Sequence, residues 1–236
     1  SAPAPSVEPA VPIITPAEPA AAPAHTTSTA PEVFEPAAEQ LASATPIATR
    51  AGGAFYLLAS VLELELGEHL WCTGVAEGPH IAAALARLAP ALSEDPAFAV
   101  IAGGDELVAL AGWAADEVVA KTRDSLGRWL GRRGVATTPD ALARWLEGDV
   151  HDAAAGALAV MVCERMGIVW SRDPARALIE RTGRIVATED ELTVELPLSS
   201  VDLDVRRAGL DRDPGWIPWL RRTVRIVHVA GDGDVY

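Results

Sequence analysis

His69 and Cys72 are the first residues whose types and spacing suggest chemistry, and Glu68 lies beside them. Residues three apart share one face of a helix, and imidazole and thiolate are ligands that zinc favours. A zinc or iron site also needs a third and a fourth ligand, and the next histidine, His80, lies beyond a Gly-Pro break. The pair therefore indicates the end of a helix with a part-buried histidine rather than a metal centre.

Asp149, His151 and Asp152 form a second titratable group, at a point where a helix is expected to begin. Carboxylates there stabilise the positive end of the helix dipole. The sequence has no GxSxG, HExxH, GxxxxGK[ST] or GxGxxG motif and no papain-like cysteine context. We expect a non-catalytic protein without a cofactor or metal. The alternative function is a metal-dependent hydrolase or toxin-like effector that uses His69 and Cys72 with His80 or His151.

Six of the tryptophans fall into two sets. Trp71, Trp113, Trp129 and Trp145 lie at helical positions, which favours anchors of the core over an aromatic ligand-binding box. Trp216 and Trp219 lie instead in a segment rich in turns.

Five arginines surround the second set on an otherwise acidic chain: Arg206, Arg207, Arg212, Arg221 and Arg222. Tryptophan and arginine together are typical of the hot spots of protein interfaces. The alternative is that the rings close a sheet over the helices while the arginines pair with Asp202, Asp204, Asp211 and Asp213. Both interpretations remain open, because one segment can complete the fold and still present a contact surface.

Composition limits the class of partner. The 236 residues carry a formal net charge of −14, and Lys121 is the sole lysine. An acidic surface repels phosphate backbones, so nucleic acid is not an expected partner. The apolar run Ala153–Cys163 is too short to span a bilayer, and no signal peptide is evident, so we expect a cytoplasmic protein without membrane insertion. Cys72 and Cys163 are expected to be free thiols.

Three regions follow along the chain. Residues 1–50 hold ten of the 18 prolines and form a Pro/Ala-rich leader that is expected to be disordered. Residues 51–230 are expected to form a single α+β domain, helical over 52–182. Residues 231–236 are expected to be a flexible tail.

Apolar spacing and capping signals predict the helices of the domain. A first helix runs from about Phe55, with a short strand over 61–66 as the alternative. Further helices are expected over 80–88, 105–133, 139–148, 149–167 and 173–183.

After Gly183 the apolar period changes from helical to alternating, which predicts a β-hairpin of residues 184–188 and 192–196. A short helix over 201–208, capped by Ser199, is expected to end at Gly209. Pro214-Gly215 forms a turn, and residues 223–229 add a third strand. The expected fold is predominantly helical with a small antiparallel sheet near the C-terminus.

Two stretches carry a resemblance to a known family. One is LPLSSVDLDVRRAGLDRDPGWIPWLRRTVRIVHV (Leu196–Val229), with GLDRDPGW (Gly209–Trp216) at its centre, and the other is GGAFYLLASVLELELGEHLW (Gly52–Trp71). They resemble an uncharacterised bacterial family encoded in gene clusters for extracellular, phage-tail-like contractile injection systems. The resemblance implies a structural, assembly or adaptor role, with protein components of such a particle as partners. It implies no catalytic residue.

Overall fold

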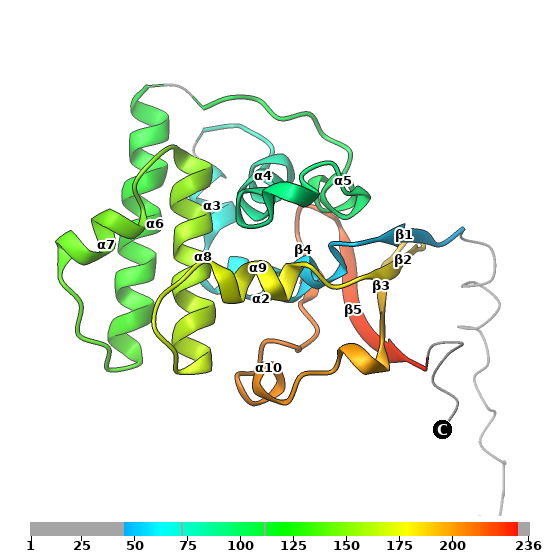
Figure 1. Ribbon diagram of the computed structural model, residues 1–236. Coiled ribbons are helices and arrows are strands. Elements are labelled where there is room, and N and C mark those ends of the chain that lie inside the picture. Colours follow the sequence, from blue (N-terminus) through cyan, green and yellow to red (C-terminus); the bar gives the residue numbers. More distant parts are fainter. Residues whose placement is uncertain (1–44, 72, 111, 231–236) are drawn as a thin grey trace, which may run out of the picture. The chain divides into compact units, whose positions relative to one another are not determined.

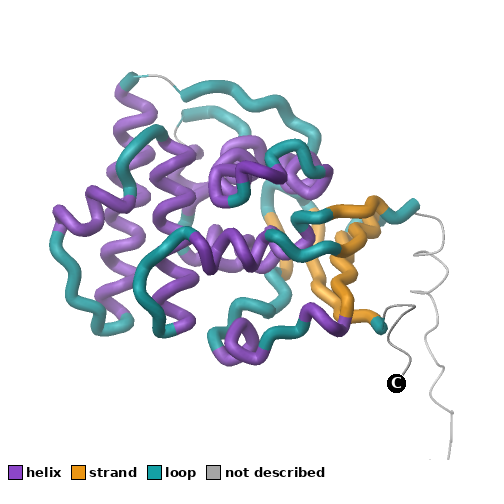
Figure 2. The backbone as a smooth tube through the Cα atoms, in the orientation of Figure 1, coloured by secondary structure: helices purple, strands orange, loops and turns teal. Residues whose placement is uncertain are grey.

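The computed structural model describes residues 45–71, 73–110 and 112–230. They form a body of helices with a small sheet at one side, in which the outer helices and the strands lie at opposite ends (Figures 1 and 2). The expected fold class, predominantly helical with a small C-terminal sheet, is confirmed. Most of the Pro/Ala-rich leader and the tail 231–236 lie outside the described residues.

The first apolar stretch folds as three short helices instead of one: η1 (Gly52–Leu57), α2 (Leu58–Glu63) and α3 (Leu66–Trp71). The break lies at Glu65, whose backbone is left-handed with a φ of 58°. Leu64 and Leu66 on either side are both buried. A continuous helix turns residues two apart to different faces, so the break is what lets both leucines enter the core. The alternative strand over 61–66 is wrong.

The next helices are α4 (Glu77–Leu88), η2 (Pro90–Leu92), α5 (Pro96–Ala102) and α6 (Trp113–Arg132). The expected start of the long helix at Asp105 is wrong, because residues 105–110 are not helical and Leu107 and Val108 are exposed. Helix α5 was not predicted from the sequence. Its start nevertheless has a local signal, because Asp95 caps it by accepting a hydrogen bond from the Ala97 amide.

Three further helices are α7 (Pro139–Trp145), α8 (Val150–Met166) and α9 (Asp173–Ile179). The first two begin at the caps read from the sequence, whereas α9 begins at Asp173 itself, after Arg172, without a side-chain cap. Thr138 accepts a hydrogen bond from the Ala141 amide, and Asp149 forms a capping box with Asp152. Helix α8 lies centrally, against α4, α6 and α9, and is buried along most of its length.

Five strands form one sheet within the described residues, in the order β1-β2-β3-β5-β4. Their bounds are β1 Ile47–Thr49, β2 Gly183–Ala187, β3 Glu191–Pro197, β4 Gly215–Ile217 and β5 Arg222–Val229. The predicted hairpin is β2 and β3, which pair antiparallel. Strand β1 falls inside the range expected to be leader.

The sheet is mixed rather than wholly antiparallel. Strands β3 and β5 run parallel, with Glu191 opposite Thr223 and Pro197 opposite Val229. Parallel neighbours need a crossover connection, and η3 (Leu198–Ser200) and α10 (Leu203–Arg207) lie in it.

Helix α10 is shorter than the predicted 201–208, and its cap is Asp202 instead of Ser199. Gly209 ends it as expected, in a left-handed conformation with a φ of 65°.

The two stretches that carry the resemblance, residues 52–71 and 196–229, meet where η1 packs against the sheet. The Tyr56 hydroxyl of η1 lies 2.9 Å from His228 Nε2 of β5. On one face of the sheet five side chains are fully buried: Ile185, Leu192, Val194, Leu196 and Val224. The N-terminal helices therefore cover the sheet that the C-terminal segment completes.

Candidate functional site

Trp216 and Trp219, the two tryptophans expected at an interface, have different surroundings. Trp216 lies on the edge strand β4 and is 57% exposed. Trp219 is half-buried, and its indole Nε1 donates a hydrogen bond of 3.0 Å to the Ile101 carbonyl at the end of α5. Trp219 thus ties the β4–β5 turn to the helices, whereas Trp216 is available for contact. Gly215, after Pro214, opens β4 with a φ of 76°.

Of the five arginines, three have a polar partner within the described residues. Arg206 pairs with Asp211 at 2.8 Å, Arg207 lies 3.5 Å from Asp204, and Arg222 donates to the Glu189 carbonyl. These contacts agree in part with the structural alternative for the arginines.

The remaining two arginines, Arg212 and Arg221, lie at backbone turns. Arg212 packs against Gly209, and Arg221 takes a left-handed conformation with a φ of 51°. One of the carboxylates expected to pair with an arginine instead binds the backbone, since Asp213 accepts a hydrogen bond from the Ile226 amide. The five side chains are therefore not one cluster of free cations.

A groove missed by the sequence analysis runs beside Trp219. It consists of two adjoining hollows of about 480 and 630 Å³, which share four lining residues: Trp71, Glu77, Pro218 and Trp219. The inner hollow adds Glu65, Gly67 and Glu68 of the α2–α3 region, and the outer one adds residues 74–76, Asp105 and Arg221. We call it the Trp71–Trp219 groove.

Two glycines allow its walls to approach each other. A Cβ at Gly78 would lie 2.4 Å from the Ala102 carbonyl oxygen and 2.9 Å from the Trp219 ring. A Cβ at Gly67 would lie 2.6 Å from a carboxylate oxygen of Glu77. Trp219 therefore packs on the backbone of Gly78, and Glu77 packs on the backbone of Gly67. In the sequence, the signal for these close contacts is the glycine at each of the two positions.

Negative charge gathers in the inner hollow. Burial raises the pKa of Glu77 above its usual range, and repulsion from the Glu68 carboxylate raises it further. Glu65 pairs with Arg128 at 3.1 Å. Within the described residues, neither Glu68 nor Glu77 forms an ion pair. The hollow therefore has two carboxylates without a compensating cation beside two indole rings.

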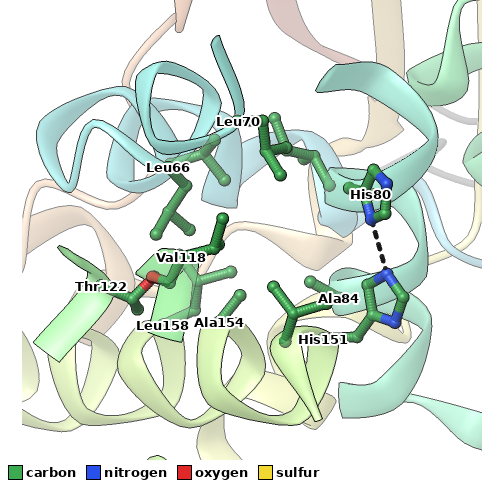
Figure 3. A pocket seen from close by; sticks show the side chains of 12 residues that line it. Leu66, Leu70, His80, Ala84, Val118, Thr122, His151, Ala154 and Leu158 are labelled. Carbon is green, nitrogen blue, oxygen red and sulfur yellow. Dashed lines mark hydrogen bonds between the residues drawn. The ribbon is translucent and has the colours of Figure 1, made fainter. Parts of the chain in front are cut away.

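A second group of titratable side chains, which does not line the groove, lies among the helices: the histidine pair His80 and His151. His80 Nδ1 lies 2.8 Å from His151 Nε2, and the stacked rings have centroids 5.0 Å apart. Figure 3 shows both rings at one edge of a small cavity, opposite Leu66, Val118 and Thr122. Its volume of about 20 Å³ is room for about one water molecule. No metabolite fits there.

Electrostatics keeps this histidine pair neutral. Burial, and then the charge of the other ring, lower the pKa of His80, and burial is also the main cause of the lowered pKa of His151. Asp149 Oδ1 lies 3.8 Å from His151 Nδ1 and opposes the shift. The predicted capping role of Asp149 and Asp152 is present as a capping box.

His69 does not join the histidine pair. Its ring lies 3.3 Å from Thr122 Oγ1 and 3.0 Å from Ser125 Oγ, on α6, and burial lowers its pKa to about 4. Cys72 lies outside the described residues, and Cys163 is a buried free thiol. Over the part of the chain that the structure describes, no three His, Cys, Asp or Glu side chains gather as a metal site. The hydrolase alternative thus gains no support from the histidines.

The prediction that four helix-borne tryptophans anchor the core is wrong for two of them. Trp129 is buried, and Trp145 packs edge-on against Trp170 with ring centroids 6.1 Å apart. Trp71 and Trp113 are 81% and 72% exposed. Both lie at a helix end, Trp71 as the last residue of α3 and Trp113 as the first of α6, so helical spacing overstated their burial.

Comparison of the chain with protein-family models, curated proteins and solved structures finds no match. Among the described helices, none is long and apolar enough to cross a membrane.

Proposed function

We propose that this protein is a non-catalytic adaptor or assembly protein and that the Trp71–Trp219 groove, with Trp216 nearby in sequence, contacts its partner. The observation that carries the proposal is the contrast between the two walls of the groove. Trp219 is held by its hydrogen bond to Ile101, whereas Trp71 leaves 81% of its surface exposed. A large aromatic surface beside a rigid wall is what interface hot spots use, because its burial gains apolar area with little loss of side-chain freedom.

The resemblance of residues 52–71 and 196–229 to a family encoded with contractile injection systems suggests the partner. We propose that it is a protein component of such a phage-tail-like particle and that the interaction takes place in the cytoplasm. The formal charge of −14 favours protein over nucleic acid as the partner.

The test is deletion of the gene in the source bacterium and complementation with variants, with intact particles counted by electron microscopy. We expect deletion to reduce particle number and the wild-type chain to restore it. Trp71→Ala, and separately Trp216→Ala with Arg221→Ala, should restore it poorly although their circular dichroism spectra match the wild type. Trp113→Ala is the matched control, because Trp113 is similarly exposed and does not line the groove.

Two results decide between the parts of the proposal. Unchanged particle number after deletion contradicts the assembly role. Full complementation by all the groove variants would leave the assembly role standing and refute the groove as its contact surface.

A further inference from the structure

The inner hollow of the Trp71–Trp219 groove combines aromatic faces with negative charge. Trp71 and Trp219 supply indole rings, and Glu68 and Glu77 supply carboxylates. The two carboxylates are close enough for Glu68 to affect the ionisation of Glu77. Bringing two like charges together in a part-buried site costs free energy unless a cation binds between them.

An arginine side chain matches this set of groups better than other cations do. Its guanidinium is planar, stacks on indole faces and donates through a fork to carboxylates. A lysine ammonium is a strongly hydrated point charge, which loses more hydration in such a site.

We infer that the Trp71–Trp219 groove binds an arginine-bearing segment of another protein, with the guanidinium stacked on the indoles and paired with Glu68 and Glu77. The inference rests on the proposed function and names the chemistry of the partner. Arg221 lines the outer hollow and not the inner one. It gives the groove a polarity, with the arginine of the partner in the inner hollow and a carboxylate or carbonyl of the same segment beside Arg221.

Residues 1–44 of this chain cannot supply an arginine. They contain five glutamates and no lysine or arginine.

The test is a titration of the full chain with an acetylated and amidated tetra-arginine peptide. The readout is the ¹⁵N–¹H resonances of the tryptophan indoles, with those of Trp71 and Trp219 assigned from Trp71→Phe and Trp219→Phe. We expect saturable shifts of these two resonances, weaker binding of tetra-lysine, and a loss of affinity at high salt. Glu68→Gln with Glu77→Gln should weaken tetra-arginine binding about ten-fold, since two charge-assisted hydrogen bonds are lost.

A matched control separates the site from overall charge. Glu94→Gln with Asp140→Asn makes the same change in net charge at exposed positions that do not line the groove, and should leave the affinity unchanged. Equal affinity of the two double variants, or no saturation of the Trp71 and Trp219 resonances up to about 1 mM peptide, overturns the inference.

Sedimentation equilibrium tests the other occupant, a second copy of this chain. Self-association that disappears in the Glu68→Gln and Glu77→Gln variant would place arginines of a second copy in the groove and overturn the assignment to another protein. The outcomes are separable from those of the proposed function. If particle number stays normal after gene deletion while peptide binding depends on the two glutamates, the particle role is refuted and the arginine site stands. If deletion lowers particle number while peptide binding does not depend on the glutamates, the arginine site is refuted and the particle role stands.

Discussion

The cavity beside the histidine pair and the Trp71–Trp219 groove both place titratable groups among apolar side chains, where a charge is unfavourable. The two regions differ in how those groups are accommodated. In the cavity, His80 and His151 are each other's partners and remain neutral, with room for about one water molecule. In the groove, Glu68 and Glu77 face solvent without an ion pair of their own. A shifted pKa therefore marks burial in both regions, and access from solvent distinguishes a packed interior from a surface able to bind.

The comparison predicts that changes in the helical interior cost stability, while changes at the groove cost mainly binding. The largest effect is expected for Gly156→Ala on α8, where a Cβ would lie 1.9 Å from the Trp145 carbonyl oxygen. Because α7 must move away, the free energy of unfolding should fall by about 3 kcal/mol in urea titrations.

Gly131→Ala on α6 is the control for that measurement, since nothing lies within 4 Å of a Cβ there. It should stabilise the protein by about 0.5–1 kcal/mol, because alanine loses less chain entropy in a helix. Equal effects of the two substitutions would contradict the close contact between α7 and α8.

Acidification is the next largest expected effect. The pKa of His69 is about 4 in the folded protein, below the value of about 6.5 in an unfolded chain, so the unfolded state binds more protons between these values. The free energy of unfolding should therefore fall as pH drops from about 6.5 towards 4, by about 2 kcal/mol at pH 5 from His69. The lowered pKa values of His80 and His151 act in the same direction.

Urea unfolding at pH 7.5 and pH 5 measures this difference. His69→Gln should reduce the change in stability between the two pH values, whatever its effect on stability at pH 7.5. A change as large as that of the wild type would show that His69 does not contribute.

A smaller loss is expected for Trp219→Phe, which removes the donor to the Ile101 carbonyl. Loss of one hydrogen bond should lower the free energy of unfolding by about 1 kcal/mol. Chemical denaturation monitored by circular dichroism gives the value. Stability unchanged from the wild type would mean that the bond does not hold the β4–β5 turn.

The smallest effect on stability is expected for Trp216→Ala, because Trp216 is exposed on the edge strand β4. The free energy of unfolding should change by less than about 0.5 kcal/mol in the same denaturation experiment. A loss as large as that of Trp219→Phe would place Trp216 among the groups that support the fold and weaken the distinction between the two tryptophans.

Local signals predicted much of the fold. Thr138, Asp149 and Gly167 mark helix ends by hydrogen bonds and backbone conformations that involve only neighbouring residues, and each is where the sequence indicated. The hairpin of β2 and β3 follows equally from short-range alternation. Such features depend on a few adjacent residues and can be read without knowledge of the tertiary structure.

Non-local features were missed. The strand β1 has three residues in a proline-rich segment and exists through its pairing with β2. The apolar spacing from Asp105 suggested a helix, but Gly103, Gly104 and Gly112 all adopt positive φ and residues 105–110 remain extended or irregular.

The groove depends on the same kind of non-local information. Its walls come from three separate stretches, between Val61 and Glu77, at Asp105 and over residues 218–221, which only the fold brings together. The sequence identified Trp219 as a candidate from its context but assigned Trp71 to the core.

The order of the strands also determines when the protein can fold during synthesis. Ile47 of β1 pairs with Ile185, and β3 receives its parallel neighbour only when Arg222–Val229 has left the ribosome. Helices α4 to α9 precede β2 in the chain and can pack before it, whereas the sheet must wait until residues up to Val229 have been made. Until then β3 has a free hydrogen-bonding edge next to apolar side chains, which is the kind of surface that aggregates or recruits chaperones. A ribosome stalled shortly before β5 would therefore display the most vulnerable form of this protein.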